Sequence, residues 1–212
     1  MKETILVLCA HNDDQVIGAG GTLIKYAQQG ATIKSIIFSF GESSHPHLQP
    51  QVIAKRRMDE SIKADKIMGG SGVAYFGLRE GKFAEQIKQK KIKEKLRLLI
   101  EREKPAKIFA HSINDPHPDH KVIAKLLIEL LPDIDCEVYT FEVWTPFRLR
   151  NRYLPKLFVD VSETFFTKMK AIRAHESQKV AITNLFLSIY LRAKLHGIAN
   201  TCKYAEVFDK LQ

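Results

Sequence analysis

The chain has 212 residues, of which 45% are hydrophobic and 27% are charged, as in ordinary globular proteins. This composition excludes global disorder, a collagen-like repeat and a coiled coil as descriptions of the whole chain. The 33 basic and 24 acidic residues give a net charge of +9, which favours an acidic partner such as nucleic acid, anionic lipid or an acidic substrate.

Apolar runs and helical patterns alternate along the first two thirds of the chain. Strands are expected at 4–10, 32–40, 73–76, 107–110 and 136–143, and helices at 18–29, 51–68, 83–103 and 119–131. A strand at 156–160 and helices at 163–174 and 182–196 follow. This alternation predicts an α/β fold, a Rossmann-like three-layer sandwich around a mostly parallel sheet. Because no linker or repeat is visible, we expect residues 1–212 to form a single domain.

The three cysteines, Cys9, Cys136 and Cys202, show no C-x-x-C spacing. They argue against a disulfide framework and a cysteine zinc site, and they fit a reducing compartment. The apolar run at 4–10 is too short for a secretory signal, and the run at 180–191 is too short for a membrane span of roughly 20 residues. We therefore expect a soluble, cytoplasmic protein without a membrane span.

Two polar loops follow strands at the edge of the predicted sheet where open α/β sheets bind ligands. The first loop is HNDDQ at 11–15, and the second is NDPHPDH at 114–120. Together they hold three imidazoles and four carboxylates, which are the side chains that ligate a catalytic zinc. An isolated Asp-Asp pair is more often a helix N-cap, and an isolated HPDH a turn. Their matching places in one α/β pattern favour a shared site.

The spacing within the loops separates ligands from a base. His11 and Asp14 are three residues apart, which places them on one side of a helical first turn, and His120 can reach them from the second loop. Asp13 points differently, because adjacent residues on a turn do not share a face. The sequence therefore predicts one divalent metal on His11, Asp14 and His120, with Asp13 free to act on the attacking water.

The segment AHNDDQVIGAGGTL resembles the A-H-P-D-D-E…G-G-T motif of the LmbE-like, or PIG-L-like, de-N-acetylases, and HPDH resembles the second motif of that family. Further matches are Arg57-x-x-Glu60 with Ala64 and Met68-Gly69, then Gly41-Glu42, and His175-x-Ser177-Gln178. The resemblance spans residues 4–180. It implies a zinc-dependent hydrolase that removes an N-acetyl group from an N-acetylglucosamine-type amino sugar. Because family members form trimers or hexamers, it also implies a homo-oligomer.

The resemblance assigns roles residue by residue. It implies one zinc ion on the ligands that the spacing predicts and Asp13 as general base. It further implies that a protonated His117 stabilises the oxyanion, that Asp119 orients or polarises an imidazole, and that Arg57 contacts the substrate. Asn12 and Gln15 depart from the family motif, which has proline and glutamate there, but neither position is a ligand.

An alternative function is a basic binding module with a degenerate site, which would hold nucleic acid or an anionic glycan. The basic run at 83–107 could supply its surface, and Gln15 is the one feature that favours it. That run also has an apolar stripe at helical spacing, formed by Ile92, Leu96, Leu99 and Ile100, which indicates a solvated face above a core. No aromatic residue follows Phe83 within the run, so we do not expect a nucleic-acid partner.

Four smaller features of the sequence can be interpreted as packing or as parts of a site. Gly18-Ala19-Gly20-Gly21 fails the G-x-G-x-x-G spacing of a dinucleotide loop, so close helix packing is expected there. His45 and His47 either line the crevice or sit on a surface loop. The aromatic residues in 144–147 either stack on a sugar ring or pack internally, and the apolar face of 182–195 is either core or subunit interface.

Overall fold

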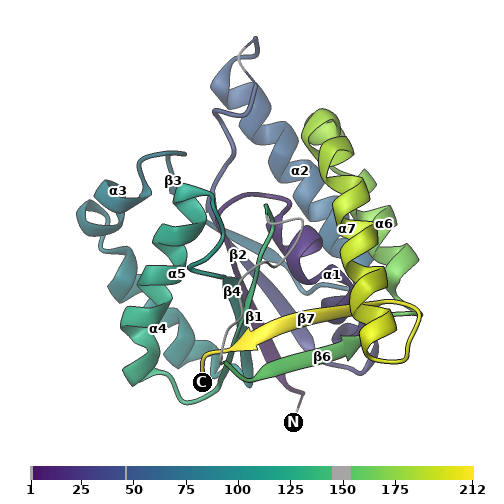
Figure 1. Cartoon of the computed structure of the whole chain (residues 1–212). Coiled ribbons are helices and arrows are strands. Elements are labelled where there is room, and N and C mark those ends of the chain that lie inside the picture. The colour runs from purple at the N-terminus through teal and green to yellow at the C-terminus, as the bar shows by residue number, and fades with distance from the viewer. Residues whose placement is uncertain (1, 46, 145–153) are drawn as a thin grey trace.

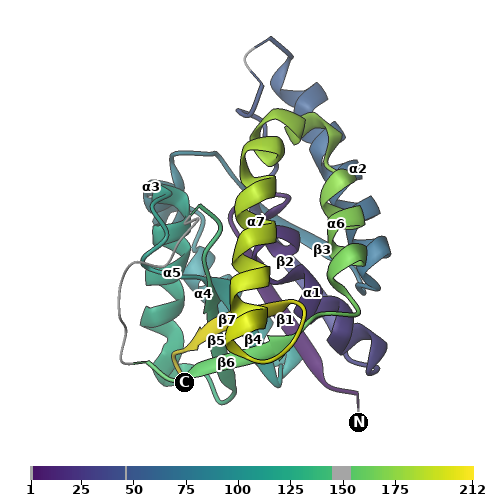
Figure 2. The same cartoon turned by 45° about the vertical axis from the view of Figure 1, so that its right-hand side comes forward.

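The computed structural model describes residues 2–45, 47–144 and 154–212, which form one seven-stranded sheet with helices on both faces (Figure 1 and Figure 2). The strands are β1 (Thr4–Cys9), β2 (Thr32–Ser39), β3 (Val73–Leu78), β4 (Lys107–His111), β5 (Glu137–Phe141), β6 (Lys156–Asp160) and β7 (Ala205–Lys210). The helices are α1 (Asp14–Gln28), α2 (Pro50–Met68), α3 (Phe83–Gln89), α4 (Ile92–Glu103), α5 (Pro118–Leu130), α6 (Phe165–Arg173) and α7 (Lys179–Ala199).

The strand order is β3-β2-β1-β4-β5-β7-β6. The first five strands of this order pair in parallel, whereas β7 runs antiparallel to both β5 and β6. The α/β class and the mostly parallel sheet expected from the sequence are therefore confirmed. Because β1 and β4 are neighbours, the two polar loops that follow them leave the sheet side by side at one edge.

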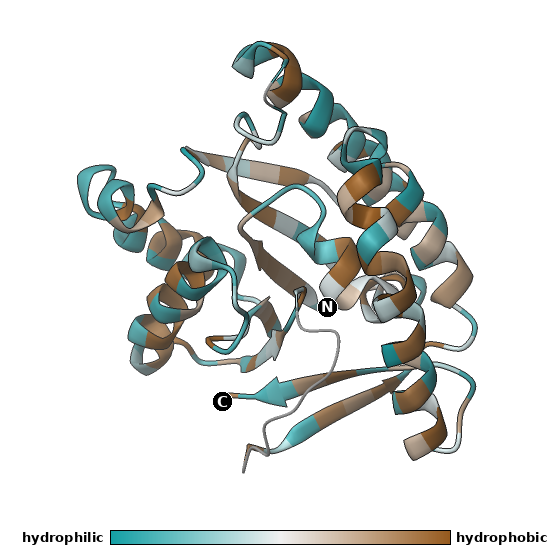
Figure 3. Ribbon diagram, turned by 45° about the horizontal axis from the view of Figure 1, so that its top comes forward, coloured by the Kyte–Doolittle hydropathy of each residue, from teal (hydrophilic) through white to brown (hydrophobic). Residues whose placement is uncertain are grey.

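The hydrophobic core lies in two layers, one on each face of the sheet. Ile5 and Val7 of β1 belong to the layer under α1, α2, α6 and α7. Leu6 and Leu8 belong to the opposite layer, under α3, α4 and α5. This alternation follows the period of two in a strand, and Figure 3 shows hydrophobic residues concentrated along the central strands. A sheet covered on both faces gives the loops at its edge a rigid base.

The single helix expected at 83–103 is wrong, because the structure has two helices, α3 and α4. The chain turns at Lys90 and Lys91, and Lys91 has a φ of 51°, in the left-handed region. The turn lets Phe83 and Ile92 enter the same core layer. The expected apolar stripe of α4 is present, since Ile92 and Leu96 are fully buried.

The strand β7 is absent from the sequence-based expectations. It places Glu206 and Asp209 in buried positions, and acidic residues are depleted in strands, so its composition does not indicate a strand. Nevertheless β7 pairs with β6 from Ala205 to Asp209 and with β5 at Asp209 and Lys210. It carries a buried carboxylate to the back of α1.

Helix α1 begins at Asp14, four residues before the expected start. The carbonyl of Asp13 accepts the first helical hydrogen bonds, from the N–H groups of Val16 (3.1 Å) and Ile17 (3.0 Å). The following small residues allow close packing, as expected: a Cβ on Gly18 would lie 2.2 Å from the Phe141 ring. The early start puts Asp14 in the first helical turn, at the sheet edge.

A buried ion pair anchors the middle of α1. Lys168 of α6 donates to the carbonyl of Ile17 (2.8 Å) and to Oε1 of Glu206 (2.7 Å). The same carboxylate accepts the backbone N–H groups of Gly21 (3.0 Å) and Thr22 (2.8 Å). Burial lowers the pKa of Lys168, and the Glu206 charge opposes that effect. Three elements far apart in sequence are thus tied together directly behind the polar loop.

Candidate metal centre and catalytic pocket

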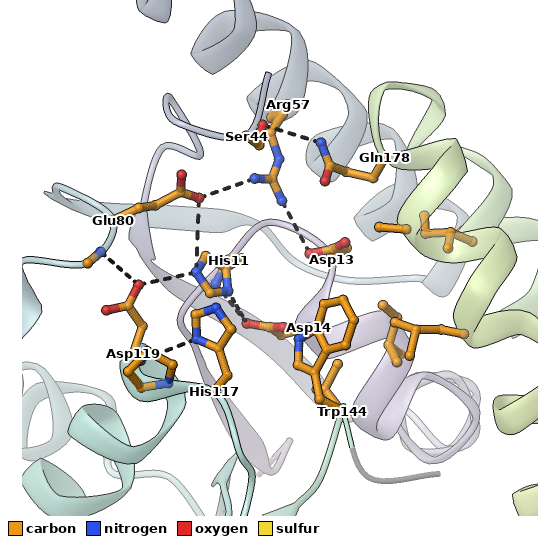
Figure 4. Close-up of a pocket in the computed structure, with 17 residues that line it drawn as sticks. His11, Asp13, Asp14, Ser44, Arg57, Glu80, His117, Asp119, Trp144 and Gln178 are labelled. Carbon is orange, nitrogen blue, oxygen red and sulfur yellow. Dashed lines mark hydrogen bonds and ion pairs between the residues drawn. The ribbon is translucent and has the colours of Figure 1, made fainter. Parts of the chain in front are cut away.

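A cavity of about 340 Å³ opens at the edge where β1 and β4 end (Figure 4). Six of the seven residues predicted for the site line it, namely His11, Asp13, Asp14, Arg57, His117 and Asp119. The seventh, His120, is fully buried on the first turn of α5 beneath the cavity. The structure therefore brings all seven predicted residues together from three elements and two loops.

The three predicted metal ligands form a compact triangle. His11 Nδ1 lies 3.2 Å from His120 Nε2 and 3.5 Å from Asp14 Oδ2. Asp14 Oδ1 lies 3.4 Å from His120 Nε2. These separations match the edge, roughly 3.3 Å, of a tetrahedron whose nitrogen ligands lie about 2.0–2.1 Å from zinc. The donor set and its spacing fit a small divalent cation.

Neighbouring carboxylates contact the outer ring nitrogens of His11 and His120, and the inner nitrogens of both rings face the triangle. Asp115 Oδ1 lies 2.9 Å from His120 Nδ1, so the proton sits on Nδ1 and Nε2 is left as a ligand atom. Asp119 Oδ2 lies 3.5 Å from His11 Nε2 and leaves His11 Nδ1 free in the same way. A histidine whose outer ring nitrogen bonds to a carboxylate while its inner nitrogen faces the ligand cluster has the arrangement that metal-ligating histidines commonly show.

The carboxylates around the two histidines favour positive charge in the site. Burial alone lowers the pKa of His11, but hydrogen bonds to Asp119 and Asp14 outweigh it and raise the pKa to about 10. For His120, the Asp14 charge and the hydrogen bond to Asp115 likewise overcome burial and raise the pKa to about 9. Burial would raise the pKa of Asp14, yet His120 holds it well below its usual range. The cluster therefore favours positive charge.

Asp115 and His111 are site residues that the sequence reasoning missed. Asp115 also accepts the backbone N–H groups of Val143 (2.7 Å) and Trp144 (3.2 Å), which ties the second loop to the end of β5. His111, the last residue of β4, stacks on His120 with 3.8 Å between ring centroids and lies 3.1 Å from Asp14. The signal available for His111 is its place at a strand end, beside the strand that precedes the first loop.

Two groups of potential metal ligands share His120: one adds His11 and His117, and the other adds Asp14 and His111. The Nε2 of His111 lies 3.0 Å from the backbone nitrogen of Ala10, which donates to it. A nitrogen that accepts this hydrogen bond has its lone pair engaged. Burial and the neighbouring His120 also lower the pKa of His111 to about 4, so the ring is neutral. We therefore regard His111 as a packing partner of His120.

Asp13 lies beside the triangle and is held by Arg57. The Arg57 guanidinium lies 3.3 Å from Asp13 Oδ1 and 3.3 Å from Glu80 Oε1. Gly41, with a φ of +80°, lets this side chain pass, because a Cβ there would lie 2.6 Å from Arg57 Cδ. Glu80, another residue missed by the sequence reasoning, lines the cavity opposite Asp13.

His117 faces the cavity as a neutral imidazole. Its Nδ1 accepts the backbone N–H of Asp119 (3.2 Å), so it caps α5 and leaves the ring proton on Nε2. Burial and the neighbours His11 and His120 lower the pKa of His117. The expected protonated imidazole does not fit this contact, and the neutral Nε2–H is the donor that His117 offers.

The two departures from the family motif are accommodated behind the cavity. Asn12 donates to the Phe40 carbonyl (3.0 Å) and accepts from the Tyr75 hydroxyl (2.7 Å). The Gln15 amide donates to the Asn12 carbonyl (3.1 Å) and to Ser61 Oγ (3.2 Å). A carboxylate could not donate to that carbonyl, so glutamine suits this surrounding. Gln15 is therefore no evidence for a degenerate site.

The remaining candidates divide between the cavity and the surface. Trp144 lines the cavity, whereas residues 145–147 lie outside the described residues. His45 and His47 contact each other edge to face, outside the cavity lining. On the basic helix, Lys93 pairs with Glu129 at 3.0 Å, as expected for a solvated face. No helix in the described part of the chain has the length and hydropathy of a bilayer crossing.

Known proteins share this architecture. The chain is 26% identical to diacetylchitobiose deacetylase of Thermococcus kodakarensis over 94% of its own length and 80% of that protein. It is 25% identical to 4-oxalmesaconate hydratase of Pseudomonas putida over 84% of its length and 75% of that protein. The solved structure of N,N'-diacetylchitobiose deacetylase from Pyrococcus horikoshii superposes with a TM-score of 0.82 at 22% identity, covering 99% of this chain and 84% of that one.

The motifs that carry the site also carry the family assignment. The match to the family described as PIG-L: GlcNAc-PI de-N-acetylase covers residues 6–131, more than half of the chain. It includes both polar loops and Arg57, and it ends just after α5. From the first buried strand to the end of the helix that holds His120, the chain belongs to the PIG-L family of de-N-acetylases.

Proposed function

We propose that this protein is a zinc-dependent hydrolase that removes the N-acetyl group from an N-acetylglucosamine-type amino sugar. The observation that carries the proposal is the ligand triangle of His11, Asp14 and His120 with Asp13 beside it in a cavity. Its deacetylase relatives act on acetylated amino sugars by name, as diacetylchitobiose deacetylase does. The single-domain organisation of residues 1–212 is part of the same proposal.

Amide hydrolysis needs an activated water and a stabilised oxyanion, and the cavity offers groups for both. A zinc ion on the three ligands would lower the pKa of water and polarise the carbonyl oxygen. Asp13 takes the proton of the attacking water and delivers it to the departing amine. The Nε2–H of His117 donates to the oxygen of the former carbonyl group. Asp119 orients the His11 ring, at 3.5 Å from its Nε2.

Residues around the proposed general base Asp13 would bind the substrate. Arg57 fixes Asp13 through its 3.3 Å contact and presents the rest of its guanidinium to the cavity, where it would meet sugar oxygens. Trp144 is 41% exposed at the cavity and offers an aromatic face for a sugar ring. The carboxylates of Glu80 and Asp119 add hydrogen-bond acceptors. This lining suits a neutral ligand rich in hydroxyl donors.

His120→Ala is expected to strip the metal at neutral pH while unfolding stays cooperative, because a structural triangle of three ligands loses its most buried member. Zinc content of the purified chain, with amine release from N-acetylglucosamine and N,N'-diacetylchitobiose, measures both halves of the proposal. His47→Ala is the matched control, since His47 lies on an exposed loop. Full metal retention in the His11, Asp14 and His120 alanine variants would contradict the proposed metal site.

We also propose that the chain forms a homo-oligomer through α7. This helix is apolar on more than one side, and its outer face exposes Val180 (80%), Leu187 (64%), Leu195 (53%) and Ile198 (64%). These residues recur at helical spacing on one stripe, which favours a helix buried on both faces. Light scattering should give a multiple of the 24.2 kDa chain mass, and Leu187→Glu with Leu195→Glu should lower it. A monomeric wild type would refute the assembly.

A further inference from the structure

The H-x-S-Q motif joins α6 to α7 and reaches the cavity. Gln178 ends the short 3₁₀ helix Glu176–Gln178 and lines the cavity beside Ser44 and Arg57. Figure 4 shows its side-chain amide at the upper wall, on the same side as Asp13. None of the catalytic roles proposed above uses this residue.

The hydrogen bonds of Gln178 fix the orientation of its amide. Nε2 donates to Ser44 Oγ (3.3 Å) and to the Ser177 carbonyl (3.2 Å), which uses both of its N–H groups. The Ser44 hydroxyl donates its own proton to the Gly41 carbonyl (2.9 Å), so it can only accept a hydrogen bond from Gln178. Among the described residues no donor binds Gln178 Oε1. The amide therefore holds one unused acceptor at the cavity wall.

A buried carboxylate holds the segment that carries Gln178. Glu60 Oε1 accepts the Ser177 N–H at 2.8 Å, and Glu60 Oε2 accepts the Ser177 hydroxyl at 2.5 Å. Glu60 is buried, and its charge strengthens both hydrogen bonds. It lies one turn after Arg57 on α2, so one helix places Arg57 against Asp13 and Ser177 beside Gln178. The R-x-x-E and H-x-S-Q motifs are thus joined by hydrogen bonds between Glu60 and Ser177.

We propose that Gln178 contacts the substrate, its Oε1 accepting a hydrogen bond from a ring hydroxyl of the amino sugar, and that Ser177 and Glu60 are positioning residues for this contact. The proposal rests on the deacetylase function proposed above. A hydroxyl is the donor that fits, because Gln178 Oε1 is a hydrogen-bond acceptor and ring hydroxyls are the donors that a neutral sugar offers most abundantly.

Gln178→Leu keeps the side-chain size and removes the acceptor. It should raise KM for N-acetylglucosamine by about 3- to 10-fold, the loss expected for one neutral hydrogen bond, with kcat and zinc content nearly unchanged. Gln89→Leu is the control, since Gln89 is exposed on α3 and bonds only to Glu85 within the described residues. Monodeoxy analogues of N-acetylglucosamine identify the hydroxyl that Gln178 contacts. Loss of that one hydroxyl should weaken sugar binding to the wild type but not to Gln178→Leu. Equal losses in both proteins for every analogue overturn the contact.

Ser177→Ala tests the positioning role, and Ser177→Thr should restore KM because it keeps the hydroxyl. A purely structural Ser177 would change the thermal midpoint without changing KM. Ser188→Ala on α7, whose hydroxyl bonds the Leu185 carbonyl, is the control. Calorimetric binding of N-acetylglucosamine to the zinc-loaded chain separates the two proposals. Binding without turnover refutes the deacetylase function alone, turnover with equal binding by Gln178→Leu refutes the contact alone, and no binding refutes both.

Discussion

Asp13→Asn should lower kcat by at least about 100-fold while zinc stays bound, because it removes a general base and keeps the shape of the side chain. Asp13 lies beside the ligand triangle and contacts Arg57 at 3.3 Å, a contact that an asparagine oxygen can still make. The cavity should therefore keep its form. Zinc stoichiometry measured beside kcat on an N-acetylated amino sugar gives the result.

Asp14→Asn is the matched variant on the same loop. Asp14 Oδ1 lies 3.4 Å from His120 Nε2, and replacing this anionic ligand with a neutral one should lower the affinity for the metal. The two adjacent aspartates thus separate base from ligand. If Asp13→Asn loses zinc and Asp14→Asn keeps it, the two roles are reversed. If both variants keep zinc and activity, this loop is not the catalytic centre.

Lys168→Met should lower the free energy of unfolding by about 3–5 kcal/mol, the usual cost of removing one partner from a buried ion pair. Lys168 is 2% exposed and Glu206 is 6% exposed, so water cannot replace the lost charge. The variant also frees the Ile17 carbonyl that the ammonium group binds at 2.8 Å. Urea denaturation at neutral pH, with the midpoint and slope fitted together, measures the change.

A surface pair provides the control for this experiment. Lys93 and Glu129 lie 3.0 Å apart, close to the 2.7 Å of Lys168 and Glu206, but their side chains are 42% and 61% exposed. Lys93→Met should therefore cost less than about 1 kcal/mol. Adding Glu206→Gln to Lys168→Met should cost less than the sum of the single changes, because each single variant leaves an unpaired buried charge and the double variant leaves none. Similar losses for Lys93→Met and Lys168→Met would contradict the anchoring role.

Much of the fold is predictable because its strands are buried on both faces and read as apolar runs. The sheet from 4 to 143 and the α4 stripe follow from such patterns. The turn at Lys91 does not, because a lysine in the left-handed region carries no sequence signal of a break. Strand β7 is not predicted for a different reason: Glu206 and Asp209 are buried by tertiary contacts that a local sequence pattern cannot show.

The candidate site divides in the same way. The triangle of His11, Asp14 and His120 follows from a three-residue spacing and from two loops at one sheet edge. The tautomer of His120 does not, since Asp115 sets it from within the second loop at 2.9 Å. The neutral state of His117 likewise depends on a single backbone N–H at the start of α5. These features require the coordinates of partners that the spacing leaves open.

The insertion of β7 between β5 and β6 imposes an order on folding. During synthesis β1 can pair with β2 and β4 early, but β5 presents an open edge until Ala205–Lys210 has been made. Glu206 then reaches Gly21 across 185 residues of sequence, a separation that makes loop closure slow. Until that moment the sheet carries an unpaired edge at β5 in addition to its outer edge at β3, and an unpaired strand edge is the usual template for pairing with another chain. Docking of β7 therefore covers the β5 edge in the same step that anchors α1 behind the first polar loop.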